Sequence, residues 1–249
     1  MDRDVYQRMI GHQSSHWWFT ARRHLLAKVI STEISQSECA AIKPLELLEI
    51  GCGPGGNLAM LAEYGQVTAT EMDPQALAHA RQLMPSLNLL QGSLPNDHNL
   101  QGQQFDLVCL FDVLEHIQQD AEALEAVFAL TKPGGLVMLT VPAYQWLFSE
   151  HDRAHHHFRR YTAGALSRLA QRKGFVVDKV GYFNTFLFPV IAARRVLARL
   201  TGQSAAQDDR MPAAWLNRLL HRIFAAEAPI VAKHPFPFGV SVVAILKRP

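Results

Sequence analysis

The chain has 249 residues, of which 49% are hydrophobic and 18% charged, a composition that favours a globular protein and excludes an intrinsically disordered one. Its formal net charge of +2 gives no basic footprint, so we expect no nucleic-acid partner. Three cysteines in unrelated contexts, no apolar signal core near the N-terminus and no run of about 20 apolar residues together predict a cytoplasmic protein.

Predicted helices and strands alternate through the first part of the chain. Residues 5–34 are expected to be helical and to precede the first strand. Five strands are then expected, at 45–50, 66–71, 87–91, 105–111 and 136–141. Helices are expected near 57–64, 74–84 and 118–131, and Pro74 opens the second of them, a position that proline favours. This alternation predicts an α/β protein whose parallel sheet is covered on both faces.

The rest of the chain adds one helix and two strands around a long insertion. Thr162 is the predicted N-cap of a helix over 162–173, and Gly174 ends that helix. The sixth and seventh strands are expected at 175–182 and 238–246. The insertion between them is expected to contain two amphipathic helices, an apolar one at 189–200 and a second at 213–226, with a polar linker at 203–212.

We therefore expect a single domain over residues 1–249. Its four parts are a helical cover, the core sheet, a helical insertion that forms a lid, and the last strand, at 1–44, 45–182, 183–234 and 235–249. Arginines flank the apolar faces of the insertion, which suits an anionic membrane surface. Peripheral membrane contact through 183–226 therefore stands beside two alternatives, a lid that packs only on the body and a dimer contact.

The most informative motif follows the first strand, where Gly51, Gly53, Gly55 and Gly56 precede a helix. Such a strand–loop–helix turn brings backbone N–H groups close to a bound nucleotide. The spacing fits a dinucleotide fingerprint, but Glu49 would repel a pyrophosphate at close range. A carboxylate there suits a cationic ligand instead, such as S-adenosylmethionine (SAM), which carries a sulfonium and an ammonium group.

Four segments in chain order resemble the class I SAM-dependent methyltransferases: Glu49-Ile-Gly-Cys-Gly-Pro-Gly, Glu71-Met-Asp-Pro, Phe105-Asp-Leu-Val-Cys-Leu-Phe-Asp-Val-Leu-Glu-His116 and Lys132-Pro-Gly-Gly-Leu-Val. The resemblance implies a Rossmann-like fold with a seven-stranded mixed sheet of order 3-2-1-4-5-7-6, in which the last two strands pair antiparallel. The N-terminal helical cover and the helical insertion between strands six and seven are added to that fold. The resemblance also implies SAM as the cofactor.

By this resemblance, Glu49 and the glycine loop hold the methionine part of SAM, and Glu71 binds the ribose hydroxyls. Met72 packs on the adenine, and Arg22 or Arg23 reaches the cofactor carboxylate. The alternatives are solvated strand-end acids, core packing for Met72, and an exposed basic helix face for the arginines. A serine replaces the aspartate that many relatives carry after strand three. The complete predicted cofactor set is Arg22, Glu49, Gly51, Cys52, Gly53, Gly55, Glu71, Met72, Ser93, Leu94 and Phe111.

A histidine-rich segment follows strand five and reads Ser149-Glu-His151-Asp152-Arg-Ala-His155-His156-His157-Phe-Arg159-Arg160-Tyr161-Thr162. With Trp17-Trp18-Phe19 it resembles a bacterial methyltransferase subgroup that has a Glu-His-Asp…His-x-Arg-Arg-Tyr-Thr pattern. A positioned base would take the proton of a hydroxyl acceptor. Candidates for it are a His151–Asp152 pair, His157, and His116 after strand four. The predicted catalytic set is His116, His151, Asp152, His157 and Tyr161.

Structural alternatives apply to the same segment. Arg159 and Arg160 suit a substrate carboxylate or phosphate, or they pair with surface acids while the histidines fill a loop and His116 caps the next helix. A zinc site at 151–157 is disfavoured, because consecutive histidines point in different directions and no cysteine cluster supports them. We therefore predict no metal site. The aromatic residues 17–19 are expected to form either a substrate wall or ordinary core.

The sequence thus predicts methyl transfer from SAM to a small or lipid-linked metabolite, with oxygen as the favoured acceptor atom. RNA or protein methylation is one alternative, and it predicts a basic groove. A non-catalytic SAM-binding scaffold is another. A dinucleotide oxidoreductase ranks last because of Glu49. The acceptor and the oligomeric state are left open.

Overall fold

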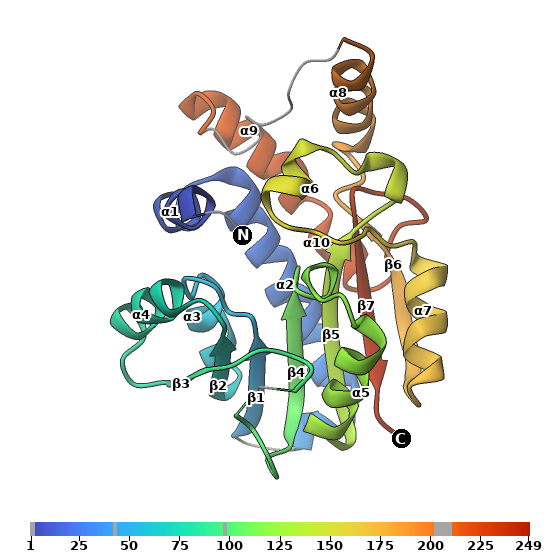
Figure 1. The fold of residues 1–249 in the computed structure, drawn as a ribbon. Coiled ribbons are helices and arrows are strands. Elements are labelled where there is room, and N and C mark those ends of the chain that lie inside the picture. Colours follow the sequence, from blue (N-terminus) through green and yellow to red (C-terminus); the bar gives the residue numbers. More distant parts are fainter. Residues whose placement is uncertain (1–2, 42–43, 97–98, 202–210) are drawn as a thin grey trace.

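The computed structural model describes residues 3–41, 44–96, 99–201 and 211–249. Within them, seven strands form one sheet in the order β3-β2-β1-β4-β5-β7-β6 (Figure 1). The first five strands pair in parallel, and β7 runs antiparallel to both β5 and β6, which confirms the predicted order and directions. The strands are β1 Leu45–Ile50, β2 Gly65–Glu71, β3 Asn88–Gln91, β4 Phe105–Phe111, β5 Thr131–Pro142, β6 Val176–Phe183 and β7 Ser241–Lys247.

Helices cover both faces of the sheet because its central strands are apolar on both sides. One face packs on α2 (Trp17–Gln36), α3 (Leu58–Ala62) and α4 (Pro74–Leu83), and the other packs on α5 (Asp120–Leu130) and α7 (Ala163–Arg172). Every residue of β4 is buried, and burial stabilises by about 1.5–3 kcal/mol per large apolar side chain. The carboxyl ends of the parallel strands stay uncovered by these layers, so the loops that follow them gather at one edge.

The predicted N-terminal helix is divided in two. Helix α1 covers Arg3–His12 and α2 begins at Trp17, so the single helix predicted over 5–34 is wrong at 13–16. His16 caps α2 by accepting the N–H of Trp18 (3.3 Å). The N–H of Trp17 is satisfied by the Oδ1 of Asn217 (2.8 Å), a distant residue that no local pattern identifies. The remaining short helices are η1 Glu38–Ala41, η2 Leu114–His116, η3 Gln145–Leu147 and α6 Glu150–Ala154.

Three helices lie between β6 and β7: α8 (Phe188–Thr201), α9 (Ala214–Ala225) and α10 (Ala228–Val231). The first two were predicted, α10 was not, and the predicted linker at 203–212 falls outside the described residues except for its last two positions. Helix α9 packs on α2, and α8 and α9 both lie in the upper part of Figure 1. No helix among the described residues is long and apolar enough to cross a membrane.

The predicted apolar face of α9 is divided between core and surface. Phe224 is buried, and Leu220 and Ile223 pack partly against the same core. Trp215 and Leu219 are instead 64% and 46% exposed. The hydrophobic pattern therefore predicted the helix correctly, and the body covers only part of its apolar face.

Candidate functional site

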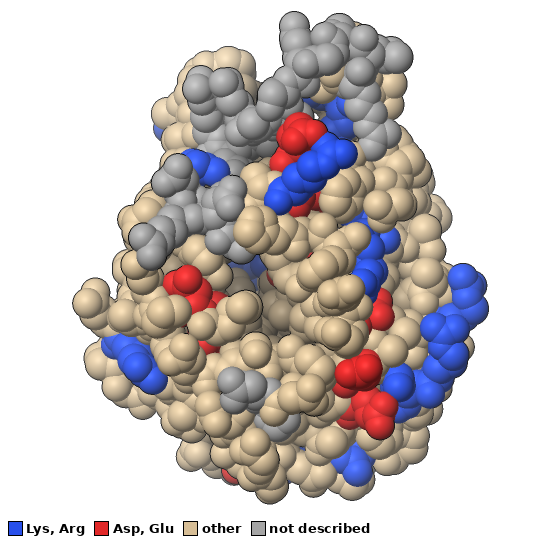
Figure 2. Space-filling model, in the orientation of Figure 1, with Lys and Arg blue, Asp and Glu red and all other residues tan. Residues whose placement is uncertain are grey.

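A cavity of about 800 Å³ opens at the carboxyl ends of the strands, within the usual size range of small-molecule sites. Its walls come from α1, α2, the glycine loop, the segments after β2, β4 and β5, and α8. Figure 2 shows this face of the molecule hollowed near its centre. The cavity lies beside β1, which pairs with β2 on one side and β4 on the other, where the strand order reverses. Ligands bind at such a switch point in open α/β sheets.

The glycine loop forms one wall of the cavity, and three of its residues adopt left-handed backbone conformations. Gly51 has φ +69°, Gly53 has φ +55° and Gly55 has φ +90°, which other residues rarely adopt. A Cβ on Gly51 would also lie 2.7 Å from the Cγ2 of Val113. Gly51, Cys52 and Gly53 line the cavity. Gly55 does not, and a Cβ there would meet Ala80 at 3.1 Å, so its small size serves the packing of α4.

Glu49, which is predicted to hold the methionine part of SAM together with this loop, is not among the residues that line the cavity. It is also no solvated strand-end acid, since only 1% of its surface is exposed. Asn57 donates its side-chain N–H to Oε1 (2.8 Å), whereas Oε2 is buried without a hydrogen-bond partner. Burial raises the pKa of Glu49 to about 7. The orphan oxygen is therefore an acceptor placed behind the loop, and it fits a cationic group approaching from the cavity side.

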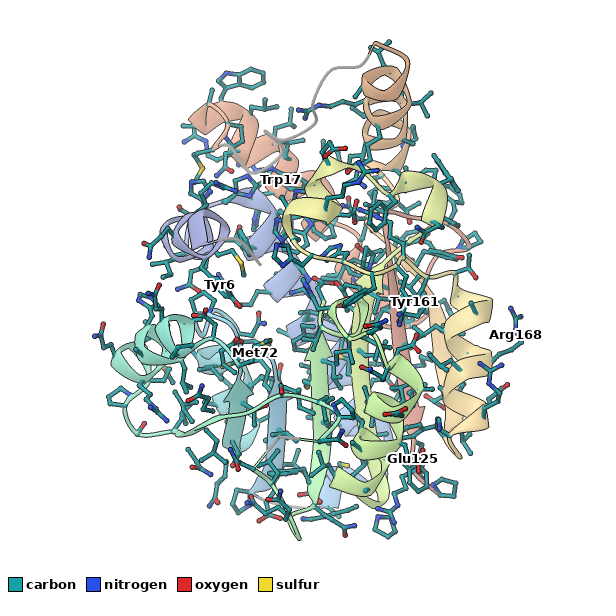
Figure 3. All side chains as sticks on the ribbon, in the orientation of Figure 1. Tyr6, Trp17, Met72, Glu125, Tyr161 and Arg168 are labelled. Atoms are coloured by element: carbon teal, nitrogen blue, oxygen red, sulfur yellow. The ribbon has the colours of Figure 1, made fainter. Side chains whose placement is uncertain are left out.

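Glu71 ends β2 and lines the cavity as predicted. Its Oε2 accepts the N–H of Gly53 and its Oε1 accepts the N–H of Asp73, both at 2.8 Å. Tyr6 of α1 hydrogen-bonds to the same carboxylate, and burial raises the pKa of Glu71. Met72 stands at the rim with 66% of its surface exposed, so it is not core. Figure 3 shows Tyr6 and Met72 on the same side of the molecule.

Ser93 and Leu94 line this end of the cavity, and Phe111 lines it after β4. The predicted positions after strands three and four are therefore brought to the same space as the glycine loop. What each of them contacts in a bound cofactor stays a prediction.

Arg22 is buried at the cavity wall and is already engaged. Its guanidinium pairs with the Oδ2 of Asp112 (2.5 Å) and donates to the Oγ1 of Thr140 (2.8 Å). It also lies over the Trp18 ring, 5.0 Å from the centroid. Arg23 donates to the carbonyl oxygen of Gly56 (2.7 Å). The exposed basic face considered for these arginines is therefore wrong.

Asp152 pairs with His157 instead of His151. Its Oδ1 accepts the Nδ1 of His157 (2.9 Å) and the Nε of Arg160 (2.7 Å). Burial alone would raise the pKa of Asp152, but the His157 hydrogen bond and the Arg160 charge hold it well below its usual range. Consecutive helical residues point in different directions, so His151 turns away. His156, with φ +57°, turns the chain back and brings His157 to the carboxylate.

His157, His116 and Glu115 meet in one cluster on the cavity wall. The Nε2 of His157 is 4.0 Å from the Oε1 of Glu115, and the His116 and His157 rings meet edge to face with centroids 4.5 Å apart. Gln119, not His116, is the N-cap of α5, so the capping alternative is wrong. Burial lowers the pKa of His116 to about 3 and also lowers that of His157. Both imidazoles are therefore neutral at physiological pH.

Glu115 is the site residue that sequence analysis missed. Its exposed fraction is 0%, and neither carboxylate oxygen has a hydrogen-bond partner in the described structure. Burial and the charge of Asp112 raise the pKa of Glu115 well above the usual range. Its own backbone N–H and the charges of Arg22 and Arg160 lower this pKa but do not offset the rise. An acid inside the apolar turn Val113-Leu-Glu-His-Ile117 was the available signal.

Tyr161 and Arg159 lie away from the cavity, which corrects the catalytic prediction for Tyr161 and the anion-binding prediction for Arg159. The Tyr161 hydroxyl donates to the Oδ2 of Asp120 (2.8 Å), and Arg159 pairs with the same oxygen (2.9 Å). Figure 3 shows Tyr161 apart from Tyr6 and Trp17. Arg160 does line the cavity but is committed to Asp152. His151 lines it too, with its ring 4.1 Å from that of His155.

Trp17, Trp18 and Phe19 line the cavity, and both tryptophans also pack against the buried core. Each tryptophan therefore both lines the cavity and packs against the core, which were given as alternatives. Their rings make this side of the cavity apolar.

The sheet order, the glycine loop and the acid that ends β2 together define a class I SAM-dependent methyltransferase. Residues 18–180 match the family described as methyltransferase domain, and the chain belongs to that family. SAM is its cofactor. The left-handed glycines and the orphan Oε2 of Glu49 fit a ligand with that cationic end.

Individual relatives agree with this class. A Mycolicibacterium smegmatis protein named "Probable S-adenosylmethionine-dependent methyltransferase" is 26% identical over 96% of this chain and 92% of its own. A ubiquinone biosynthesis O-methyltransferase of Yersinia pestis is 35% identical over 38% of this chain, a match that spans 41% of that enzyme. The plantazolicin methyltransferase BpumL, solved with SAH, superposes with a TM-score of 0.62 over 100% of this chain and 91% of its own, at 14% identity.

Proposed function

We propose that this protein transfers the methyl group of SAM to an oxygen atom of a small or lipid-linked metabolite. The observation that carries the proposal is that one cavity joins the glycine loop and Glu71 to the buried cluster of Glu115, His116 and His157. The sulfonium of bound SAM supplies an electrophilic methyl carbon. The protein then has to orient the acceptor and remove its proton.

On the cofactor side, Glu71 is the proposed acceptor for the ribose hydroxyls. Its carboxylate is held by the N–H groups of Gly53 and Asp73, and this support keeps it oriented toward the cavity. Glu49 provides negative charge behind the loop. Arg22 pairs with Asp112. In this proposal the pair holds the Asp112 carboxylate in place at the part of the cavity that binds SAM.

On the acceptor side, His157 is the proposed base when no metal ion is bound. Asp152 accepts its Nδ1–H (2.9 Å), which leaves the Nε2 lone pair on the side of Glu115. A histidine oriented in this way by a carboxylate can take a hydroxyl proton as the methyl group is transferred. The hydroxyl oxygen keeps the electron pair that forms the new bond to the methyl carbon, and the sulfonium carbon–sulfur bond breaks.

The residues that line the acceptor part of the cavity favour an apolar acceptor. Trp17, Phe19 and Ile191 line it, and Val190 and Leu197 of α8 expose 69% and 60% of their surfaces nearby on the same helix as Ile191. In this proposal α8 and α9 form a lid over the acceptor. On the face in Figure 2, basic and acidic side chains are interspersed, which supports a small metabolite over a nucleic acid.

The acceptor class is tested by supplying purified protein with methyl-labelled SAM and three cell fractions: water-soluble metabolites, solvent-extracted lipids, and acid-precipitable RNA and protein. We expect label in one of the first two fractions. Mass spectrometry of that product should show loss of methanol, which identifies a methoxy group. Label confined to the precipitate, or on nitrogen, would contradict the proposal.

Replacing Glu71 with alanine is expected to raise the Kd for SAM about 30-fold or more, since charged hydrogen bonds of about 1.5–3 kcal/mol each are lost. Calorimetric titration with SAM measures this. Glu63→Ala, at an exposed position after α3, is the matched control and should leave Kd unchanged. An unchanged Kd in Glu71→Ala would refute the ribose assignment.

SAM affinity is expected to rise with pH through neutrality. The pKa of Glu49 is raised to about 7, so the carboxyl is protonated below that pH and charged above it, and a cationic ligand favours the charged form. Between about pH 6 and pH 7.5 the Kd should fall about fivefold to tenfold. Glu49→Gln should flatten this dependence, whereas Glu46→Gln, at an exposed position of the same strand, should preserve it. A profile equally steep in Glu49→Gln would exclude Glu49 as its cause.

A further inference from the structure

Glu115 lacks the partners that a buried carboxylate normally has. It is fully buried, and both of its oxygens are without hydrogen bonds in the described structure. The guanidinium groups around it are directed elsewhere: Arg22 to Asp112, and Arg160 to Asp152. Leaving two buried carboxyl oxygens without a partner is costly, and a cation between the acid and the cavity would satisfy both of them.

The imidazoles of His116 and His157 lie next to Glu115. One ligand atom each from Glu115, His116 and His157 lie within 4.8 Å of one another. The Nδ1 of His157 is held by Asp152 at 2.9 Å, which leaves its Nε2 for a further bond. A carboxylate behind a histidine in this way is the usual support of a histidine that binds a metal.

We propose that Glu115, His116 and His157 bind one divalent transition-metal ion, with Asp152 orienting His157. Two imidazoles and one carboxylate favour Zn²⁺ or Mn²⁺ over Mg²⁺ and Ca²⁺, which prefer oxygen ligands. Three protein ligands leave at least one position open on the cavity side for an oxygen of the acceptor. This proposal departs from the expectation of no metal site, which was weighed only for residues 151–157.

The consequence for catalysis rests on the proposed O-methyl transfer, whereas the binding site itself does not. A bound ion occupies the Nε2 lone pair of His157, so His157 no longer acts as the base. The ion then lowers the pKa of an acceptor hydroxyl that it contacts, and the released proton passes to water. The acceptor oxygen is thereby held beside the post-β4 segment that lines the cofactor side of the cavity.

Metal binding is measured without SAM or acceptor. The full chain is freed of metal with EDTA, dialysed, and titrated with Zn²⁺, Mn²⁺ and Mg²⁺ in a calorimeter. We expect one equivalent of Zn²⁺ and no binding of Mg²⁺. Glu115→Gln and His157→Gln should each weaken Zn²⁺ binding by about 100-fold or more, and Asp152→Asn by about 10–100-fold, the size seen for outer-shell partners. His234→Gln, at an exposed position outside the cavity wall, should leave the Zn²⁺ affinity unchanged.

Circular dichroism verifies that each variant is folded, and the visible spectrum of the Co²⁺-loaded protein reports nitrogen and oxygen ligation independently of affinity. The absence of one-equivalent Zn²⁺ or Mn²⁺ binding would overturn the proposal, as would Zn²⁺ binding that is lost in His234→Gln but kept in Glu115→Gln. In the labelled-methyl assay, loss of product in EDTA and recovery with Zn²⁺ supports the catalytic consequence. Full O-methyl product in EDTA would refute that consequence while leaving the proposed function intact.

Discussion

Asp152→Ala is expected to lower the free energy of unfolding by about 3–5 kcal/mol, the size found when one partner of a buried ion pair is removed. The side chain is 0% exposed and accepts from His157, both Nε and Nη2 of Arg160, and the N–H of Ser149. Its removal leaves the Arg160 guanidinium, itself 3% exposed, without its carboxylate. Urea unfolding followed by circular dichroism measures the change.

Glu125→Ala is the control for this experiment. Glu125 pairs with Lys173 at 2.8 Å but is 72% exposed, so solvent screens the pair and its loss should have little effect on the free energy of unfolding. Because the folded pKa of Asp152 is depressed, its contribution is present above the unfolded value of about 3.8 and is lost only as the pH falls below it. Equal effects of the two variants at pH 7 would show that Asp152 is not the anchor of this segment.

His157→Ala is expected to reduce kcat for the labelled-methyl reaction by about 10²–10⁴-fold, the usual contribution of a positioned base, and to reduce it also where His157 instead holds the proposed ion, while leaving the Kd for SAM unchanged. His157 is the only predicted catalytic histidine that the described structure hydrogen-bonds to Asp152. The cell fraction that yields labelled product serves as the substrate in this assay. The Kd for SAM is measured by calorimetry.

His151→Ala is the matched comparison, because it removes another histidine from the wall of the same cavity. Its effect on kcat should be at least tenfold smaller than that of His157→Ala. If His151→Ala were the more damaging variant, the base would be assigned to the wrong histidine. Partial rescue of His157→Ala by added imidazole would support a chemical role over a structural one.

Most of the fold followed from local patterns. The alternation of apolar strands and helices, the N-cap at Thr162, whose side chain accepts the N–H of Ala165 (3.2 Å), and the proline that opens α4 each depend on near neighbours in the chain. The break between α1 and α2 did not, because Asn217 from α9 completes the start of α2. Local periodicity contains no information about such a partner.

The sequence by itself determined the cofactor half of this protein: the glycine loop, the acid that ends β2, and their meeting at one edge of a parallel sheet follow from spacing along adjacent elements. Only the tertiary structure decided the acceptor half. The turn at His156 decides which histidine forms a hydrogen bond with Asp152. The segments packed around Glu115 decide whether its carboxyl group is solvated or is buried without a partner. Residue type sets what a side chain can do, but burial and partners come from distant parts of the chain.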